Sequence, residues 1–330
     1  MAHAPITITA LLMLALTHSS MSVTVQELFP DVKNNLTLVK WSHAINNKNM
    51  LNAALASNET MMIEADVVLG ILKTDNNSTP PYPVMGHPPH LQNLDLSLEE
   101  FLKHILDAHS KENKKVGMKL DFKSIEAFEA SIDIVKKHNI TVPLWVNADI
   151  LEGPVNATTA NGAPLAVNAK LFLDGAAKLP QALLSIGWTT RVLSQTGLNA
   201  TYTGNYTLEQ ANIMISKLQD SKTNQSVTYP VRACFVANDD KDTDVLGKLL
   251  TNSSSNNPTL TVWSAVEDKN VNATKLSEVI KRIGVEKVYL DVPEELYNKL
   301  SLNSAINTKN SKLIQFSSLL IAAIASLRIH

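Results

Sequence analysis

The sequence predicts an α/β fold, a closed (β/α)8 barrel. First, short apolar runs alternate along the chain with amphipathic helical stretches, which is the pattern of βαβ units around a parallel sheet. Second, there are eight such runs, and their near-continuous apolar character is typical of strands buried on both faces. The runs are Leu38–His43, Met61–Leu69, Val116–Phe122, Pro143–Ile150, Ala182–Trp188, Pro230–Val236, Leu260–Ala265 and Lys287–Val292.

An open, doubly wound sheet is the main structural alternative for this pattern. No Gly-rich phosphate loop follows the first run, and such a loop is the usual support for a dinucleotide-binding sheet. Right-handed crossovers and a count of eight therefore favour a barrel. The longest stretch without a predicted element is Gly70–Leu96, and a loop of that length in a compact domain is usually functional or disordered.

Helical stretches occupy the intervals between these runs. Two of them begin with a capping box, Ser97 with Glu100 and Thr207 with Gln210, in which two side chains satisfy the free amides of a helix start. An apolar stripe at helical spacing follows the third run and another precedes the last. The remaining predicted helices are Asn47–Ala56, Leu165–Lys178, Asp242–Leu250 and a short last helix with Pro293 as its first residue.

Both ends of the chain resemble targeting signals. The apolar run Ile6–Leu16, with small residues after it, predicts a secretory signal peptide over residues 1–22; a buried N-terminal helix is the alternative. Small residues at 303–305, a polar spacer and the apolar run Leu313–Leu327 predict a glycosylphosphatidylinositol (GPI) anchor signal over residues 301–330; an amphipathic last barrel helix is the alternative. The barrel itself is expected over residues 23–300.

The remaining composition agrees with an extracellular, glycosylated protein. Cys234 is the single cysteine, so there is no intrachain disulfide, and a large core needs none. The formal net charge of -2 provides no basic field for nucleic acid, so a phosphate-bearing ligand must be held locally by a metal ion or a few cations. Glycosylation is expected at the sequons of Asn35, Asn58, Asn139, Asn156, Asn199 and Asn205.

Polar side chains follow the ends of the first four predicted strands, which is where a barrel of this kind carries its active site. They are His43, Glu64, Asp66, Asp121, Lys123, Asn147 and Asp149, with His87 in the long loop after the second strand. Taken singly, each is better explained as a rim salt bridge, a helix cap, a packed histidine or plain loop. Together, on consecutive strand ends, they favour a functional site.

The spacing of the acidic residues predicts a metal site. Residues two apart on a strand share a face, so Glu64 and Asp66 project together and Asp121 joins them from the next strand. Carboxylates that close raise one another's pKa unless a cation compensates them. Oxygen ligands in this number suit Mg²⁺ or Ca²⁺, and we expect one divalent ion.

The order of these motifs resembles the phospholipase C-like phosphodiesterase barrels, the glycerophosphodiester phosphodiesterases and sphingomyelinase D among them. "LDFK" in particular looks like the corresponding strand of sphingomyelinase D. The wider sequence is similar to the menorin family, because "WSHAINN", "MIEADV", "GHPPH", "KLDFKS", "NADIL" and "LSIGWTT" occur in order across Leu36–Val292. The phosphodiesterase pattern is broken by Ala44–Ile45, where Arg-Gly is common, and by Pro88, where Asp is common.

The phosphodiesterase resemblance implies a division of roles. Glu64, Asp66 and Asp121 would hold Mg²⁺, and Lys123 would neutralise phosphoryl oxygens. His43 and His87 would act as general base and acid, because histidine titrates near working pH. Asn147, Asp149 and Trp188 would line the substrate side, although simple packing explains Trp188 equally well.

Two functions remain open at this point. One is an extracellular metal-dependent phosphodiesterase acting on a lipid or glycerol phosphodiester. The other is a non-catalytic extracellular ligand or adhesion cofactor that has kept the barrel and meets a cell-surface receptor, since the menorin family is associated with guidance of neuronal branching. Fold alone does not decide between them.

Overall fold

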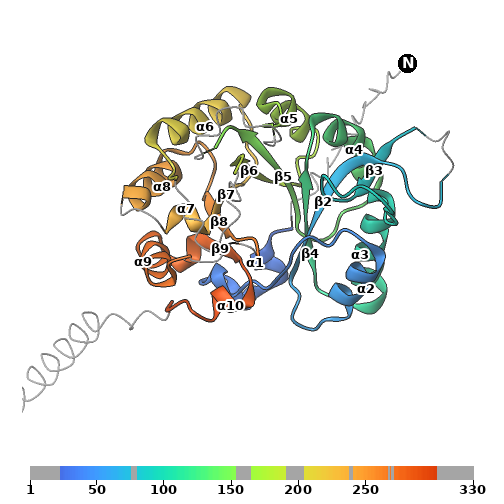
Figure 1. The fold of residues 1–330 in the computed structure, drawn as a ribbon, viewed down its shortest axis with the longest axis horizontal. Helices are drawn as coiled ribbons and strands as arrows, with labels where there is room; N and C mark the ends of the chain where they lie inside the picture. Colours follow the sequence, from blue (N-terminus) through green and yellow to red (C-terminus); the bar gives the residue numbers. More distant parts are fainter. Residues whose placement is uncertain are drawn as a thin grey trace, which may run out of the picture.

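The computed structural model contains the predicted barrel and describes residues 23–75, 80–153, 165–190, 204–237, 241–266, 268 and 271–302 (Figure 1). Eight parallel strands follow one another in the order β1-β2-β4-β5-β6-β7-β8-β9. The strands are β1 Trp41–Ser42, β2 Met62–Gly70, β4 Gly117–Phe122, β5 Leu144–Leu151, β6 Leu183–Trp188, β7 Val227–Arg232, β8 Thr259–Trp263 and β9 Val288–Asp291.

The helices surround these strands in Figure 1. The longer ones are α2 Lys48–Ala56, α3 Leu98–Glu112, α4 Ile125–Lys137, α5 Ala169–Ala176, α6 Leu208–Ser221, α8 Lys241–Asn252 and α9 Ala273–Ile283. Short segments complete the fold: α1 Val25–Leu28, η1 Pro30–Val32, η2 Leu36–Leu38, α7 Ala233–Val236, η3 Val285–Lys287 and α10 Glu294–Tyr297. Pro293 is the N-cap of α10 instead of its first residue. No helix in the described part of the chain is long and apolar enough to cross a membrane.

Both predicted capping boxes are present, at the starts of α3 and α6. Replacing Ser97 by alanine is expected to lower the free energy of unfolding by about 1 kcal/mol, because the Glu100 amide would lose its cap. Ser110→Ala, on the exposed side of the same helix, is the matched control and should change stability by less than about 0.5 kcal/mol. Chemical denaturation of the three proteins measures the difference, and equal losses from both variants would contradict the expectation.

The sixth predicted strand is only partly a strand in the structure. The run Pro230–Val236 was expected to be a strand, but β7 ends at Arg232 and the chain continues as the buried helix α7. The strand instead begins at Val227 and contains Thr228, whose hydroxyl lies 2.8 Å from that of Thr261 inside the barrel. A hydrophobic run was therefore the wrong criterion here, since part of this barrel's interior is polar.

The long stretch Gly70–Leu96 contains a ninth strand. β3, Tyr82–Met85, pairs antiparallel with the outer half of β2 and forms a hairpin beyond the parallel barrel. Pro83 lies within it, as expected only for an edge strand, where a missing amide donor is tolerated. The returning strand ends beside the barrel, where the Gly86 amide donates to the Asp66 carbonyl.

One end of the barrel is closed by apolar packing. Trp145 packs edge-on against Trp41 and Tyr289, with ring centroids 5.2 and 4.8 Å apart. The N-terminal segment through η2 covers these rings with Val25, Val32, Leu36 and Val39. Polar groups can therefore gather only toward the carboxyl ends of the strands, the end that we call the mouth.

The barrel closes differently at its seam. β1 has only two residues, and within the described chain no backbone hydrogen bond joins it to β9. A side-chain hydrogen bond between His43 and Asp291 bridges this gap instead.

Several predictions fall outside the described residues. These are the signal peptide (residues 1–22), nearly all of the spacer and tail (303–330), and the glycosylation sites Asn156 and Asn199. Of the other sequons, Asn58 and Asn139 are exposed, Asn205 is half-buried, and the Asn35 side chain caps η2 by accepting from the Thr37 amide.

Candidate metal centre at the barrel mouth

The structure brings the three predicted metal ligands together. β2 and β4 pair in register, so that Asp66 lies opposite Asp121 and Glu64 opposite Lys119. One carboxylate oxygen from each of Glu64, Asp66 and Asp121 can be chosen so that all three lie within 4.8 Å of one another. Oxygen ligands bind Mg²⁺ at about 2.1 Å and Ca²⁺ at about 2.4 Å, so this spacing accommodates either ion.

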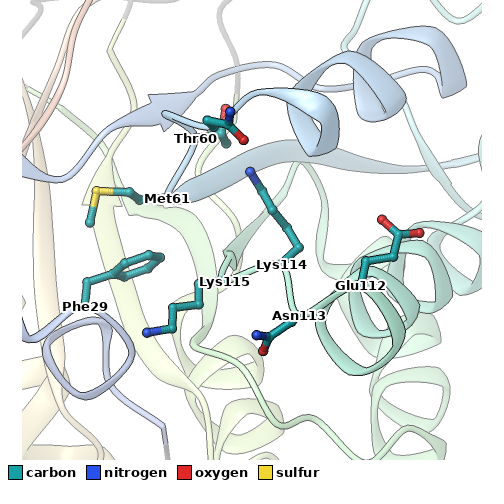
Figure 2. A pocket seen from close by; sticks show the side chains of 8 residues that line it. Phe29, Thr60, Met61, Glu112, Asn113, Lys114 and Lys115 are labelled. Atoms are coloured by element: carbon teal, nitrogen blue, oxygen red, sulfur yellow. The ribbon is translucent and has the colours of Figure 1, made fainter.

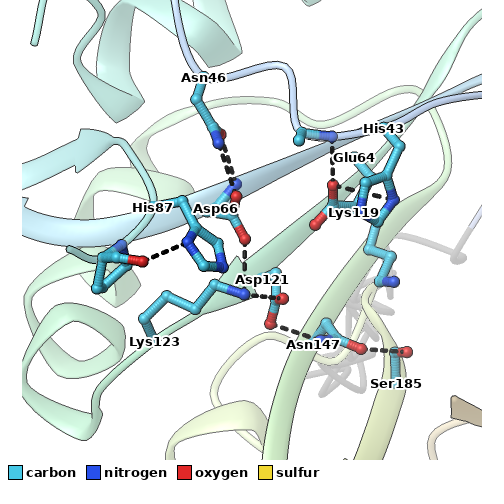
Figure 3. A network of polar contacts seen from close by, with 12 residues as sticks. His43, Asn46, Glu64, Asp66, His87, Lys119, Asp121, Lys123, Asn147 and Ser185 are labelled. Atoms are coloured by element: carbon cyan, nitrogen blue, oxygen red, sulfur yellow. Dashed lines mark hydrogen bonds and ion pairs between the residues drawn. The ribbon is translucent and has the colours of Figure 1, made fainter. Parts of the chain in front are cut away.

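Lys123 is the cation that compensates these carboxylates in the structure. Its Nζ lies 2.6 Å from Asp66 and 2.5 Å from Asp121 (Figure 3). Burial opposes the charged form of Lys123, but the carboxylates of Asp121 and Asp66 outweigh it and hold its pKa well above the usual range. A positive charge between these two groups is therefore favourable, which is the electrostatic condition that a divalent ion would also meet.

The backbone after β1 holds the two β2 carboxylates in place. The Ala44 amide donates to Glu64 at 2.7 Å, and Ala44 adopts a left-handed φ of 55° to do so. A non-glycine residue at positive φ costs about 1 kcal/mol, so the surrounding contacts must over-determine this turn. Asn46 brackets Asp66 with two hydrogen bonds, one to its carboxylate at 2.6 Å and one from its amide at 2.9 Å. Sequence reasoning missed Asn46.

Asn147 holds the third carboxylate from the neighbouring strand. Its amide nitrogen donates to Asp121 at 2.5 Å, while its oxygen accepts from the buried hydroxyl of Ser185 at 2.6 Å. Both polar ends of Asn147 are thus engaged in orienting Asp121. The residue was predicted to line the substrate side; in the structure its contacts hold Asp121 of the acidic cluster.

Burial and neighbouring charges shift the pKa values of the mouth carboxyl groups in opposite directions. Burial raises the pKa of Glu64 to about 7, against the opposing effect of His43. Burial and the charge of Asp121 raise the pKa of Asp149 to about 7 as well. Burial also opposes ionisation of Asp121, but Lys123 and Lys119 outweigh it and lower its pKa.

His43 lies beside the cluster and bonds across the seam. Its Nδ1 is 3.0 Å from Asp291 Oδ2 and 3.5 Å from Glu64 Oε2. A carboxylate can only accept a hydrogen bond, so Nδ1 carries hydrogen and Nε2 is the nitrogen left for other partners. Burial favours neutral His43, but Asp291 and Glu64 outweigh it and raise its pKa to about 10. The side chain is 44% exposed, so solvent screens these charges in part.

Asp291 is the partner that sequence reasoning missed. It is 2% exposed and ends β9. Burial opposes its ionisation, but His43 and Lys119 outweigh it and lower its pKa. The sequence carried a signal, because Asp291 stands in the last predicted strand at the same rim position as the other candidates.

His87 lies at the edge of the mouth and is exposed. Its backbone neighbour Gly86 bonds to Asp66, and Figure 3 shows the imidazole beside Asp66 and Lys123. The Nδ1 atom is 2.5 Å from the carbonyl oxygen of Pro88. The structure thus places His87 near the acidic cluster while its ring hydrogen-bonds to the loop.

Two predicted substrate residues lie on opposite faces of the sheet. Asp149 points into the barrel, and Gly187 leaves room for it: a Cβ there would lie 2.9 Å from its Oδ1. Trp188 is 2% exposed and packs on Tyr206 and Tyr229 in the layer between strands and helices. Its position agrees with the packing explanation that the sequence left open.

A second ionic group, also absent from the sequence analysis, lies across the mouth. Arg232, at the end of β7, donates two hydrogen bonds to Asp268, at 2.9 and 2.6 Å, and its guanidinium lies 4.8 Å from the Trp263 ring centroid. The Arg232 side chain is 9% exposed and that of Asp268 is fully buried. Because the residues around Arg232 are apolar, the sequence pattern did not indicate that its side chain points into the barrel.

A hollow of about 460 Å³ lies away from this cluster (Figure 2). It is lined by residues that precede β2 and β4, Thr60 and Lys115 among them, together with Phe29. These are the amino ends of the strands, opposite the mouth. The chemistry-bearing side chains at the carboxyl ends are therefore better evidence for a site than this hollow.

The side chains that surround the acidic cluster carry more negative than positive charge, and one divalent ion would balance the excess. Five carboxylates face the mouth, balanced by two lysines and one histidine; when all are charged, the excess is two negative charges. The carboxylates are Glu64, Asp66, Asp121, Asp149 and Asp291, and the cations are Lys119, Lys123 and His43.

Fold and site together define a (β/α)8 barrel protein with a buried acidic cluster at the carboxyl ends of two adjacent strands. The sequence profile of the Menorin N-terminal domain matches residues 35–297. The chain belongs to the menorin family. It is 34% identical to human Protein FAM151B over 259 residues, which cover 78% of this chain and 83% of that protein.

Two solved structures that match this chain are distant from it. A trimodular GH5_4 subfamily endoglucanase has a TM-score of 0.41 and 9% identity, covering 88% of this chain and 59% of that chain. The 3-keto-D-glucoside 4-epimerase of E. coli has a TM-score of 0.35 and 11% identity, covering 59% and 73%. These values are too low to carry any argument about function.

Proposed function

We propose that this chain is an extracellular, metal-dependent phosphodiesterase that acts on a lipid or glycerol phosphodiester. The observation that carries the proposal is the convergence of Glu64, Asp66 and Asp121 at the mouth, beside His43. The signal peptide, glycosylation sites and C-terminal anchor signal predicted from the sequence support an extracellular, membrane-attached location in the same proposal.

Each group has a chemical task in this proposal. Glu64, Asp66 and Asp121 would hold one Mg²⁺ or Ca²⁺, which when bound supplies Lewis-acid neutralisation of phosphoryl charge. Lys123 adds a fixed ammonium beside the same oxygens. His43 exchanges its proton through Nε2, with Asp291 fixing the ring through Nδ1, and His87 serves the opposite side of the phosphorus.

The test is turnover of lysophospholipids, sphingomyelin and glycerophosphodiesters with and without Mg²⁺. We expect Mg²⁺-dependent product, and His43→Ala should lower kcat by about a hundredfold or more, the usual scale for a lost acid–base group. The matched control is His104→Ala, an exposed histidine on α3 whose Nδ1 meets only the Glu100 carbonyl; it should retain full activity. Identical traces from the parent and His43→Ala would exclude this activity on those substrates.

The non-catalytic alternative is favoured by one observation, the exposed His87 whose Nδ1 bonds to Pro88 in the loop. In that case the protein is an extracellular ligand or adhesion cofactor for a cell-surface receptor. The double variant His43→Ala, His87→Ala would then rescue a loss-of-function phenotype fully. Failure of rescue with normal surface expression would favour catalysis.

A further inference from the structure

We propose that Lys119 is an oxyanion-binding residue on the floor of the mouth and that its ligand is a tetrahedral phosphoryl group. The inference rests on the proposed function and deepens it, because it names a substrate contact that the sequence motifs do not include. Lys119 lies in the middle of β4, two residues before Asp121 and four before Lys123. The three side chains therefore share the inward face of the strand.

The Lys119 side chain is buried along its length, and its ammonium makes one long ion pair and no hydrogen bond within the described residues. The residue is 4% exposed, and its closest carboxylate oxygen, on Asp291, is 4.0 Å from Nζ. Within the part of the chain that the structure describes, no acceptor lies within hydrogen-bond distance of Nζ. An ammonium has three donors, and none of the three is used by a hydrogen bond to a described residue. An oxygen ligand from outside would accept from these donors.

The position of Lys119 is central in the mouth. Below it, Nζ lies 5.8 Å from the ring of Trp41, which belongs to the aromatic closure of the opposite end. Its charge lowers the pKa of groups from five parts of the chain: His43, Glu64, Asp121, Asp149 and Asp291. A ligand oxygen beside Nζ would thus be close to the predicted metal ligands and to His43 together.

Lys123 differs from Lys119 in its contacts. Its Nζ contacts two carboxylates at 2.6 and 2.5 Å, so two of its three donors are already used within the cluster. In Figure 3, Lys119 is drawn beside Glu64 and His43 with no dashed line to either. The lysine with all three donors open is the deeper one, and it is the better candidate to donate hydrogen bonds to an anionic oxygen of a ligand.

The test uses two binding measurements that respond with opposite signs. Removing the charge in Lys119→Met should tighten Mg²⁺ binding about threefold or more, because a cation no longer repels the ion. The same change should weaken the binding of inorganic phosphate and of glycerophosphocholine to the Mg²⁺-loaded protein about tenfold or more, the scale of a charged hydrogen bond. Calorimetric titration of the full chain measures both, and a general disturbance of the fold would weaken both.

Two further variants serve as controls for these binding measurements. Lys170→Met removes an exposed lysine on α5 and should change neither affinity. Lys119→Gln keeps a polar side chain and replaces Lys119→Met if circular dichroism shows that the methionine variant is unfolded. Binding of phosphate but not of glycerophosphocholine would identify free phosphate as the ligand and still support the proposal.

The proposal is overturned if phosphate affinity is the same with and without the Lys119 charge, or if the parent binds no phosphate with or without Mg²⁺. The proposed phosphodiesterase activity fails separately, when phosphate binds through Lys119 but no phosphodiester is turned over.

Discussion

Without a divalent ion, the protein is expected to be more stable at pH 5 than at pH 7.5, and saturating Mg²⁺ is expected to remove or reverse that difference. The pKa of Glu64 rises from 4.5 to about 7 and that of Asp149 from 3.8 to about 7 in the folded chain. A carboxyl group with a raised folded pKa favours folding while it is protonated, and that stability is lost as pH rises from the unfolded to the folded pKa.

Other mouth groups do not cancel this effect in the same window. The raised pKa of His43 acts in the same direction above pH 6.5, although its exposure weakens the contribution. The lowered pKa values of Asp121 and Asp291 matter only below about pH 4, where those carboxylates begin to protonate in the unfolded chain. Stability should therefore fall by about 2 kcal/mol between pH 5 and 7.5, or roughly 5 °C in Tm.

Bound Mg²⁺ would neutralise the carboxylates that lose their protons as pH rises. Its stabilising effect on the folded protein should therefore grow with pH. Thermal unfolding with chelator or with Mg²⁺, at both pH values, measures the four cases. Glu64→Gln should flatten the pH dependence of the chelated protein. A chelated parent protein that gains stability on going from pH 5 to 7.5 would contradict the expectation.

Replacing Asp268 by alanine is expected to lower the free energy of unfolding by about 3–5 kcal/mol, because it would remove the carboxylate that accepts two hydrogen bonds from the buried Arg232 guanidinium. Asp268 also accepts from the Ala265 amide at 3.1 Å and the Ser264 hydroxyl at 3.2 Å, so its loss affects the β8 end as well.

Two variants make the Asp268 experiment specific. Asp174→Ala breaks the ion pair with Lys170, which is as short as the Arg232–Asp268 pair but exposed. This variant should lower the free energy of unfolding by less than about 1 kcal/mol. The double variant Arg232→Met, Asp268→Leu removes both charges and should recover part of the loss. Denaturant unfolding compares them, and a loss below about 1 kcal/mol for Asp268→Ala would mean that Arg232 is satisfied by other contacts.

The barrel could be predicted from sequence because most of its strands are apolar on both faces. β2 and β4–β6 lie within a residue or two of their expected bounds. β7 failed because Thr228 faces a polar interior, and interior polarity depends on what the opposite strand contributes, here Thr261. The run that continued to Val236 is apolar for a different reason, since α7 is a buried helix.

Only part of the candidate site could be predicted from the sequence, for a related reason. Glu64, Asp66, Asp121 and Lys123 lie on paired strands at fixed spacing, so local periodicity was enough to group them. Asp291 is 248 residues from His43 along the chain, and its role depends on barrel closure. The sequence around Lys119 does not indicate that its ammonium lacks a hydrogen-bond acceptor. This property depends on the positions of neighbouring residues in the folded barrel.

The seam has an evolutionary consequence. His43 and Asp291 link the first and last strands where the backbone does not. A descendant that abandoned chemistry would still be stabilised by this pair, because it links the two strands. Relatives that keep the histidine and its aspartate would therefore not have to be active enzymes. Loss of Lys119 or of the β2 carboxylates would be the better indication that a relative has lost enzymatic activity.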